Sequence, residues 1–454
     1  MRLSFYGGVR MVTGSNYLLE IDPSTGSGST RILVDCGLFQ GSNFCERLNF
    51  EPFPYQPQEI EAVFITHAHI DHIGRLPKLY HEGFRGKVFS TPATKDFAKE
   101  MLLDSEQLLR EEAEREKKPL LYEASDIEKL MALWEGVEYY QKFKFKELEV
   151  EFQNAGHILG SSIITIKALD KKLIFSGDLG NIPNPLTEPM DLISEADYCI
   201  MESTYGDRIH EEPERRKDIL ENLIEDTVRK RGTLLIPAFA MERTQELLYE
   251  LNELVENGRI PPVPIFIDSP LAIKLTKIYQ KYQKYFSPEA RHSIAQGDSL
   301  FKFPGLKMTL TTEESKTINE VPPPKVIIAG SGMSHGGRIL HHERRYLPDS
   351  NSTILFIGWQ AAGSLGRRIL EGEKEIKIFG EVIPVKCRVM AIGGYSAHAD
   401  LPTLINWLRP MRQSLKKVFV VQGEEESSLV LAQKIKDELA VEAIAPTLGE
   451  ECVL

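Results

Sequence analysis

The chain has 454 residues, too many for one ordinary domain, so two or three domains are expected. It is 42% hydrophobic and 26% charged, as in folded globular proteins, and no apolar run approaches the roughly 18 residues of a membrane span. A net charge of −12 argues against a general nucleic-acid coat, which is usually basic. It leaves room for a locally positive cleft, because bound divalent metal ions add charge that this sum ignores.

The cysteines and the N-terminal sequence favour a cytoplasmic protein. The five cysteines are scattered and never form a CxxC pair, which is typical of reduced thiols rather than of a disulfide framework. The first residues, MRLSFYGGVRMVTG, lack the architecture of a signal peptide. We therefore expect no membrane association.

Short β-rich apolar segments recur along the chain, and each stops at small or polar residues. In chain order they begin at 31, 62, 172, 198, 233, 264, 325, 353 and 388. Between several of them lie helical patterns such as residues 243–258, with apolar residues three and four apart. This alternation predicts an α/β fold, in which functional groups gather at the carboxyl ends of strands. Residues 104–147 are charged and are predicted to be helical and free of strands, either as a solvated excursion or as a lid over the site.

The stretch ITHAHIDHIG, residues 65–74, concentrates metal-binding side chains. His67 and His69 lie on one side of an extended segment, because alternate residues point the same way. Asp71 and His72 follow where the chain must turn, so they can face a second point nearby. One loop can thus serve two metal ions, and a solvated histidine-rich loop is the weaker alternative.

Further ligands are expected at other strand ends. His157 stands among small residues in NAGHILGSS, and Asp178 ends the apolar run KLIFSGDLG, where a carboxylate can bridge two cations. Asp35, in LVDCG, can accept the second N–H of a ligand imidazole. Each motif alone is more often a turn, but their order with HAHIDH favours a metal site.

With these motifs the chain resembles the metallo-β-lactamase superfamily. The resemblance implies an αββα sandwich in which His67, His69 and His157 hold one Zn²⁺. Asp71 and His72 would hold a second Zn²⁺, with Asp178 bridging. Such a pair generates a metal-bound hydroxide near neutral pH and neutralises charge on the reacting group.

The residues that follow resemble the β-CASP branch, the nucleic-acid-processing metallo-β-lactamases, and most closely its bacterial-type RNA-processing ribonucleases. MESTYGDR (201–208) matches the branch's first additional motif and supplies Glu202; YSAHAD (395–400) matches its second and supplies His398. The implied layout is a metallo-β-lactamase domain in residues 1–206, an inserted α/β β-CASP domain in 207–384 and a return to the first domain in 385–454. His398, oriented by Glu202, is a reasonable general acid, and Asp71 completes the implied catalytic set.

A glycine-rich turn after a predicted strand, KVIIAGSGMSHGGR (325–338), is a candidate phosphate site. Successive backbone N–H groups can bind an anion there. We assign the RNA backbone to Ser331, Gly332, Met333, Arg338 and Ser396, with Arg344, Arg345, Arg367 and Arg368 extending the track. A structural turn is the alternative.

The branch's third additional motif departs from the expected pattern. Its RNA-processing members usually carry a histidine that completes the second zinc's ligands, whereas this chain has Gln422, in KVFVVQGEEES (417–427). No histidine follows His398. A glutamine oxygen is a neutral, harder donor, so Gln422 would be a weak ligand, and the second site would bind Zn²⁺ weakly or take Mn²⁺.

The leading hypothesis is a zinc-dependent ribonuclease that cuts single-stranded RNA, most simply as an endonuclease in RNA processing or decay. Metal-hydroxide attack would leave 5′-phosphate and 3′-hydroxyl ends. A DNA nuclease of the same branch is the first alternative, and a non-catalytic RNA-binding subunit with a weakened second metal site is another. A small-ester or thioester hydrolase fits poorly with the large insertion. Family analogy adds a homodimer as an expectation.

Overall fold

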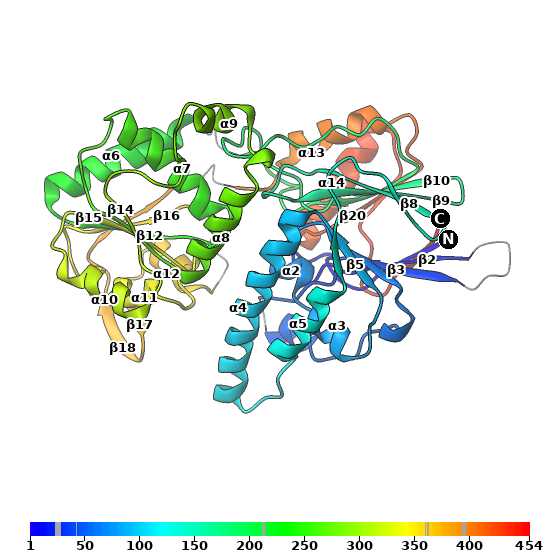
Figure 1. Ribbon diagram of the computed structural model, residues 1–454, viewed down its shortest axis with the longest axis horizontal. Coiled ribbons are helices and arrows are strands. Elements are labelled where there is room, and N and C mark those ends of the chain that lie inside the picture. Colours follow the sequence, from blue (N-terminus) through cyan, green and yellow to red (C-terminus); the bar gives the residue numbers. More distant parts are fainter. Residues whose placement is uncertain (23–28, 42, 211–213, 359, 361–362, 393–395) are drawn as a thin grey trace. The chain divides into compact units, whose positions relative to one another are not determined.

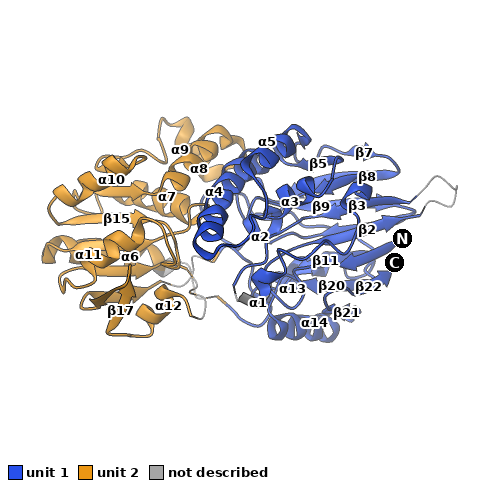
Figure 2. Ribbon diagram, turned by 90° about the horizontal axis from the view of Figure 1, so that it is seen from below, with its two compact units in different colours: residues 1–209, 397–454 blue, residues 210–396 orange. Residues whose placement is uncertain are grey.

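The computed structural model describes residues 1–454 apart from 23–28, 42, 211–213, 359, 361–362 and 393–395. The chain divides into two compact units, coloured separately in Figure 2. Unit 1 comprises residues 1–209 and 397–454, and unit 2 comprises residues 210–396. None of the helices in the described part of the chain combines the length and the apolar character that a membrane crossing requires.

The first sheet of unit 1 joins antiparallel strands from both ends of the chain to a parallel series. Its order is β22 (Glu451–Val453), β1 (Arg2–Phe5), β2 (Tyr17–Ile21), β3 (Thr30–Val34), β4 (Ala62–Phe64), β5 (Lys87–Ser90) and β6 (Trp134–Gly136). The pairs from β22 to β3 are antiparallel, and those from β3 to β6 are parallel. The carboxyl ends of β3 and β4 therefore lie at the same edge.

The second sheet of unit 1 supplies the other strand ends that the sequence singles out. Its order is β21 (Ala443–Ile444), β20 (Lys417–Val421), β11 (Tyr198–Glu202), β10 (Lys171–Phe175), β9 (Ser162–Ala168), β8 (Leu148–Asn154) and β7 (Phe143–Phe145). Strands β10, β11 and β20 are parallel neighbours. Asp178, Glu202 and Gln422 thus follow or end adjacent strands.

The two sheets of unit 1 pack face to face because their strands alternate. Leu173 and Phe175 of β10 join a core that also contains Phe64 of the first sheet, whereas Ile174 points to the opposite face. On that opposite face, Ile174 packs in a cluster with Trp407 and other residues of the C-terminal helices. The predicted continuous apolar runs are therefore strands buried on both faces.

Helices cover both outer faces of the sandwich (Figure 1). On the side of the first sheet lie α2 (Ile70–Ile73), α3 (Leu76–His81), α4 (Pro92–Glu116) and α5 (Ala124–Ala132). On the side of the second sheet lie α13 (Leu401–Leu408) and α14 (Glu425–Leu439). The remaining short helices are α1 (Asn43–Arg47) and the 3₁₀ turns at Pro57–Glu59 and Arg409–Met411. The predicted αββα sandwich is confirmed.

Unit 2 is built around a parallel sheet. Its order is β14 (Leu306–Met308), β13 (Ile265–Asp268), β15 (Lys325–Ala329), β12 (Thr233–Pro237), β16 (Thr353–Phe356) and β19 (Arg388–Ala391). The helices are α6 (Glu214–Lys230), α7 (Arg243–Glu256), α8 (Pro270–Lys281), α9 (Pro288–Ala295), α10 (Thr312–Thr317), α11 (Ile339–Tyr346) and α12 (Leu365–Leu370). An antiparallel hairpin, β17 (Glu375–Ile378) and β18 (Glu381–Pro384), and 3₁₀ turns at Gln283–Tyr285 and Ile318–Glu320 complete the unit. The inserted α/β domain is confirmed.

The prediction that residues 104–147 contain no strand is wrong. Strands β6 and β7 lie within this segment. Trp134 is buried where β6 pairs with β5, and Phe143 and Phe145 of β7 contact the rings of Phe64 and Phe89 in the core. These aromatic side chains stabilise the two short strands. The surrounding charged residues obscure the apolar pattern by which strands are predicted from sequence.

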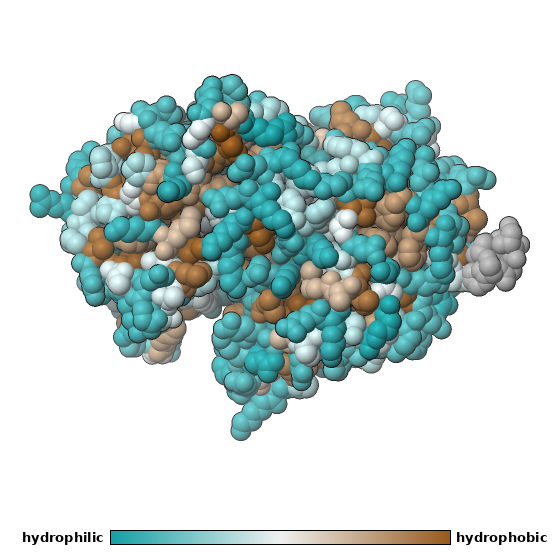
Figure 3. All heavy atoms as spheres, in the orientation of Figure 1, coloured by the Kyte–Doolittle hydropathy of each residue, from teal (hydrophilic) through white to brown (hydrophobic). Residues whose placement is uncertain are grey.

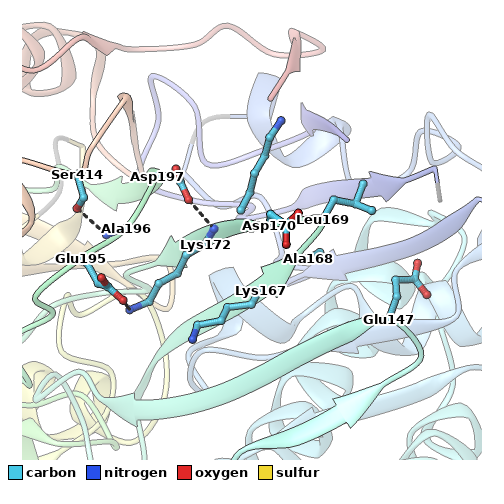
Figure 4. A pocket seen from close by; sticks show the side chains of 11 residues that line it. Glu147, Lys167, Ala168, Leu169, Asp170, Lys172, Glu195, Ala196, Asp197 and Ser414 are labelled. Carbon is cyan, nitrogen blue, oxygen red and sulfur yellow. Dashed lines mark hydrogen bonds and ion pairs between the residues drawn. The ribbon is translucent and has the colours of Figure 1, made fainter. Parts of the chain in front are cut away.

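Neither the surface shown in Figure 3 nor the surface pocket of unit 1 indicates which ligand the protein binds. On the face shown in Figure 3, hydrophilic side chains predominate on each unit, with hydrophobic ones in small groups. A surface pocket of about 560 Å³ lies at the start of β10, the end of that strand opposite Asp178 (Figure 4). Its Lys172 pairs with Glu195 at 3.7 Å and Lys167 pairs with Glu149 at 3.7 Å. Because these charges neutralise each other, we assign no ligand to this pocket.

Candidate metal centre

The loop after β4 is fixed to the loop after β3. Asp35 accepts hydrogen bonds from Thr66 N and Thr66 Oγ1, both at 2.9 Å, and lies 2.7 Å from His72 Nδ1. A Cβ on Gly37 would stand 1.6 Å from the carbonyl oxygen of Asp71, so only glycine permits this approach. Asp35 therefore contacts Nδ1 of His72, as expected for a carboxylate that accepts the second N–H of a ligand imidazole. The Nε2 atom of His72 is left to face the site.

His157 and Asp178 reach the same point from two further loops. The loops pack glycine against backbone: a Cβ on Gly180 would stand 1.9 Å from the carbonyl oxygen of Gly156. Gly156 itself has a φ of +68°, in the left-handed region that favours glycine. The small residues flanking these two side chains thus bring them together.

Three imidazole nitrogens converge on the first point. His67 Nε2 lies 3.1 Å from His69 Nδ1, which lies 3.2 Å from His157 Nε2. Burial lowers the pKa of His67 and of His157 well below the usual imidazole range, so both rings are neutral and present lone pairs. Nitrogens bound to one tetrahedral Zn²⁺ are about 3.3 Å apart, so this donor set fits a metal ion.

A second donor set lies beside the first and shares Asp178. Candidate ligand atoms of Asp71, His72 and Asp178 lie within 4.8 Å of one another, as do those of His67, His69, His157 and Asp178. One oxygen of Asp178 is 3.4 Å from His67 Nε2 and the other is 3.4 Å from His72 Nε2. The carboxylate thus faces both sets, as a bridging ligand would.

Three carboxylates determine the electrostatics of the second set. Burial lowers the pKa of His72, but the carboxylates of Asp178, Asp71 and Asp35 outweigh it and raise that pKa well above its usual range. Burial also raises the pKa of Asp71 to about 6. The carboxylates of Asp178, Asp71 and Asp35 thus favour positive charge at this point, which a bound cation would supply.

Glu202 and His398 form a pair at the edge of these sets. Glu202, wholly buried at the end of β11, accepts from Leu179 N at 2.6 Å through Oε1, the atom that lies 3.3 Å from His398 Nδ1. Burial lowers the pKa of His398, but Glu202 outweighs it and raises that pKa to about 9. His398 is 23% exposed in its side chain and belongs with Asp178 and Glu202 to a third convergent set. The ring is therefore a protonated group beside the metal donors, open to solvent.

Gln422 also reaches the second donor set. Its Nε2 lies 2.9 Å from Asp71 Oδ2, 3.1 Å from the carbonyl oxygen of Val12 and 3.0 Å from His72 Nε2. Its Oε1 is buried and accepts no hydrogen bond from the described residues. The amide nitrogen, rather than the expected carbonyl oxygen, thus faces Asp71.

The glycine-rich turn of unit 2 is stabilised largely by its own groups. The N–H groups of Ser331, Ser334 and His335 donate to Gly336 O, Ser331 O and Ser331 Oγ. The carbonyl oxygens of Gly332 and Met333 accept from Gln360 Nε2 and Gly366 N. Several of the N–H groups expected to form an anion site are therefore used within the turn.

Arg338 is directed into unit 2. Its Nη1 donates to Asp268 Oδ1 at 2.8 Å and to Thr309 O at 2.9 Å, and its Nη2 donates to Leu310 O at 3.0 Å. Asp268 also contacts His342 Nε2 at 2.7 Å. Three of the other four predicted cations form ion pairs as well: Arg344 with Glu381, Arg367 with Glu371 and Arg368 with Glu373. The fourth, Arg345, lies over the ring of Tyr346, 5.8 Å from its centroid. These side chains have protein partners where the sequence suggested phosphate.

The second additional motif is described only in part. Its first residue, Tyr395, and the preceding Gly393 and Gly394 lie outside the described residues. Ser396, the predicted RNA contact, is half-buried.

Sequence reasoning missed three groups that organise the site. Thr66 links Asp35 to the metal loop, and Ala397 presents its carbonyl oxygen 3.3 Å from His157 Nδ1. Thr204 donates its hydroxyl to Gln422 O at 3.0 Å and its N–H to Glu202 Oε2 at 3.2 Å. Thr66 and Ala397 adjoin His67 and His398 in the sequence, and that adjacency is the only signal that points to them.

Family models match most of the chain. They are a metallo-beta-lactamase superfamily domain over residues 25–194, a Beta-Casp domain over 244–369 and a Zn-dependent metallo-hydrolase RNA specificity domain over 382–446. Among solved structures, a protein of unknown function from Enterococcus faecalis aligns with a TM-score of 0.56 at 14% identity, over 100% of this chain and 99% of that one. That likeness concerns the fold alone.

Curated relatives extend over nearly the whole chain. Ribonuclease TTHA0252 of Thermus thermophilus is 38% identical over 95% of this chain and 95% of its own. An RNase J-like protein of Methanocaldococcus jannaschii is 30% identical over 98% of both chains. Transcription termination factor FttA of Methanosarcina mazei is 31% identical over 98% of this chain and 70% of its own. With the metal donor sets above, these matches show that the chain belongs to the β-CASP branch of the metallo-β-lactamase superfamily and is a metal-dependent hydrolase.

Proposed function

We propose that this protein is a ribonuclease that hydrolyses phosphodiester bonds within single-stranded RNA. The observation that carries the proposal is the Glu202–His398 pair, set beside Asp178 and the metal donors. Hydrolysis of a phosphodiester needs an acid for the departing oxygen, and a protonated imidazole held by a carboxylate is suited to that task. Relatives named ribonuclease and RNase J-like, and the match to an RNA specificity domain over residues 382–446, support RNA as the substrate.

The site would hold two Zn²⁺ ions. His67, His69, His157 and Asp178 would bind one, and Asp71, His72 and Asp178 the other. When bound, such ions lower the pKa of a coordinated water and offset negative charge on the phosphate. Asp35 would keep Nδ1 of His72 occupied, so that Nε2 remains the ligand atom.

His398 would act on the leaving group. As water adds to phosphorus, the bond from phosphorus to the 3′ oxygen breaks, and the ring proton passes to that oxygen. The products are a 3′-hydroxyl and a 5′-phosphate. Glu202, whose Oε2 is held by Thr204 N, keeps the ring oriented and stabilises its charged form.

We propose that the glycine-rich turn and Ser396 lie along the RNA backbone. Because three N–H groups of Arg338 already donate to Asp268, Thr309 and Leu310, Arg338 would shape this surface rather than neutralise a phosphate. Ser331, Gly332 and Met333 remain the candidate contacts, and such contacts would position the strand without reading its bases.

A circular single-stranded RNA tests the proposal, since only an endonuclease can open a molecule without ends. Under single-turnover conditions the protein should linearise the circle and leave a matched DNA circle intact. Cleavage of DNA at an equal rate would favour the DNA-nuclease alternative. Binding without cleavage at saturating Zn²⁺ and Mn²⁺ would favour the non-catalytic RNA-binding alternative and would overturn the proposal.

A further inference from the structure

Gln422 occupies a constrained place at the end of β20. Its backbone has a φ of +49°, and its N–H donates to Gly8 O at 2.5 Å. A Cβ on Gly8 would stand 2.6 Å from Gln422 Oε1, so the absence of a side chain at Gly8 makes room for the amide. Only 3% of Gln422 is exposed. The side chain is therefore held in one orientation, toward Asp71.

Neighbouring oxygens distinguish the nitrogen of this amide from its oxygen. Three polar atoms surround the terminal atom nearest the site: a carboxylate oxygen of Asp71 at 2.9 Å, the carbonyl oxygen of Val12 at 3.1 Å and His72 Nε2 at 3.0 Å. The two oxygens are acceptors, and an amide nitrogen has two N–H groups to donate to them. An oxygen in this place would face two oxygens at hydrogen-bonding distance. A metal ion next to Asp71 would relieve only one of these contacts, because the carbonyl oxygen of Val12 would remain opposed.

The two donor sets consequently differ in the number of protein side chains that they contain. The first contains four side chains, His67, His69, His157 and Asp178, and the second contains Asp71, His72 and Asp178. A cation with three protein donors keeps open positions and dissociates more readily than one held by four. Asp71 accepts the hydrogen bond from Gln422 Nε2 through its Oδ2.

We propose that Gln422 is a positioning residue that fixes Asp71 by hydrogen bonding, and that the second cation is held by three protein donors and exchanges while the first stays bound. Thr204 joins this contact to the Glu202–His398 pair, because it donates to both Gln422 O and Glu202 Oε2. If the proposed function holds, RNA cleavage would follow the free concentration of the exchangeable cation.

Counting metal ions on the zinc-loaded full chain tests this inference without RNA. The protein is dialysed against a series of buffered free-zinc concentrations, and the bound zinc is measured. The wild type should lose one equivalent at a free-zinc concentration at least about tenfold higher than the other. Loss of both equivalents in a single step would overturn the proposal. Failure to cleave RNA leaves this result unaffected, so the two proposals fail separately.

Paired variants decide whether Gln422 is a ligand. Gln422→Met removes the hydrogen bond but keeps the side chain's length, and should weaken the second equivalent by about ten- to a hundredfold, the usual effect of losing a ligand's partner. His72→Gln removes a donor atom of the second set and should abolish that equivalent. Equal loss in the two variants would make Gln422 a ligand and overturn the proposal.

Gln422→His supplies the converse test. An imidazole there adds a fourth donor to the second set. The free-zinc concentrations at which the two zinc ions dissociate should therefore differ by no more than about threefold. Gln433→His, on the exposed face of α14, controls for an added histidine and should leave both of these concentrations unchanged. In a crystal structure of the zinc-loaded wild type, Nε2 should face Asp71. A Gln422 oxygen at about 2.2 Å from the second ion would contradict the inference.

Discussion

The metal centre of unit 1 and the glycine-rich turn of unit 2 occupy similar positions in their sheets but differ in chemistry. Both lie in loops at strand ends, and most of these loops follow buried strands of parallel series, where ligands collect in α/β folds. His157, in the loop after the antiparallel strand β8, is the exception. In unit 1, imidazole nitrogens face one another at 3.1 and 3.2 Å. In unit 2, Arg338 and His342 face Asp268, and Ser334 faces Glu343. The lone pairs of the first arrangement would be satisfied by a cation, whereas in the second the carboxylate of Asp268 is satisfied by the side chains of Arg338 and His342.

This difference shows how a binding site can be told from a structural network of the same composition. Lone pairs that converge without a proton between them are costly unless a ligand satisfies them. Charged groups that satisfy each other instead stabilise the fold, and removing one leaves its partner buried and unpaired. Substituting one residue of each arrangement should therefore affect cleavage in unit 1 and stability in unit 2.

The largest expected effect is that of His398→Ala on RNA cleavage. Loss of the general acid should slow the reaction by about 10²–10⁴-fold. An RNA with sulfur in place of the 3′ bridging oxygen has a leaving group that needs no proton, so the variant should cleave it at close to the wild-type rate. His341→Ala, at an exposed histidine of unit 2, is the matched control. Equal slowing on both substrates would remove His398 from this role.

Arg338→Ala should destabilise unit 2 more than it weakens RNA binding. The substitution leaves Asp268, which is wholly buried, without its guanidinium partner, and should lower the free energy of unfolding by about 3 kcal/mol. Denaturant unfolding measures this loss. Arg344→Ala, which breaks an exposed pair with Glu381, should cost under about 1 kcal/mol. A stable Arg338→Ala protein whose RNA binding is uniformly weaker, with a flatter salt dependence, would restore the phosphate-binding interpretation.

Glu343→Gln should change how stability depends on pH. Burial raises the pKa of Glu343 from its ordinary value of 4.5 to about 8. Between these values the folded protein keeps a proton that the unfolded chain has released, so stability falls as pH rises. In unfolding experiments from pH 5 to 8, the free energy of unfolding of the glutamine variant should fall less steeply with pH than that of the wild type. The difference in slope should be up to about 1.4 kcal/mol per pH unit. Parallel profiles for wild type and variant would show that Glu343 titrates normally.

Much of the metal centre is predictable from sequence because its ligands are local to strand ends. An apolar run that stops at His, Asp or Glu places that side chain at the edge of a sheet, and parallel strands share that edge. This logic places Asp178 and Glu202 at one edge of the second sheet and His67 at the carboxyl edge of the first, and the packing of the two sheets brings the edges together. The same logic did not predict β6 and β7, which depend on a buried Trp134 and on the half-buried Phe143 and Phe145 rather than on an apolar run.

Partners distant in sequence account for what was not predicted. The position of Arg338 after a glycine-rich turn favours a phosphate site, yet its acceptor, Asp268, stands 70 residues earlier on another strand. Likewise, nothing near Gln422 in sequence indicates that Val12, Gly8 and Asp71 surround its amide. Composition and spacing identify groups capable of binding; only the fold shows which of them are already satisfied.

Mapping the ends of RNA fragments tests the central claim most directly. A mixed pool of single-stranded RNA is incubated with the zinc-loaded protein and, in parallel, with Asp178→Ala, which lacks the carboxylate shared by both donor sets. The wild type should produce internal cuts with 5′-phosphate and 3′-hydroxyl ends, and the variant should leave the pool intact. An intact pool with the wild type, or the same fragments from both proteins, would contradict hydrolysis at this metal centre.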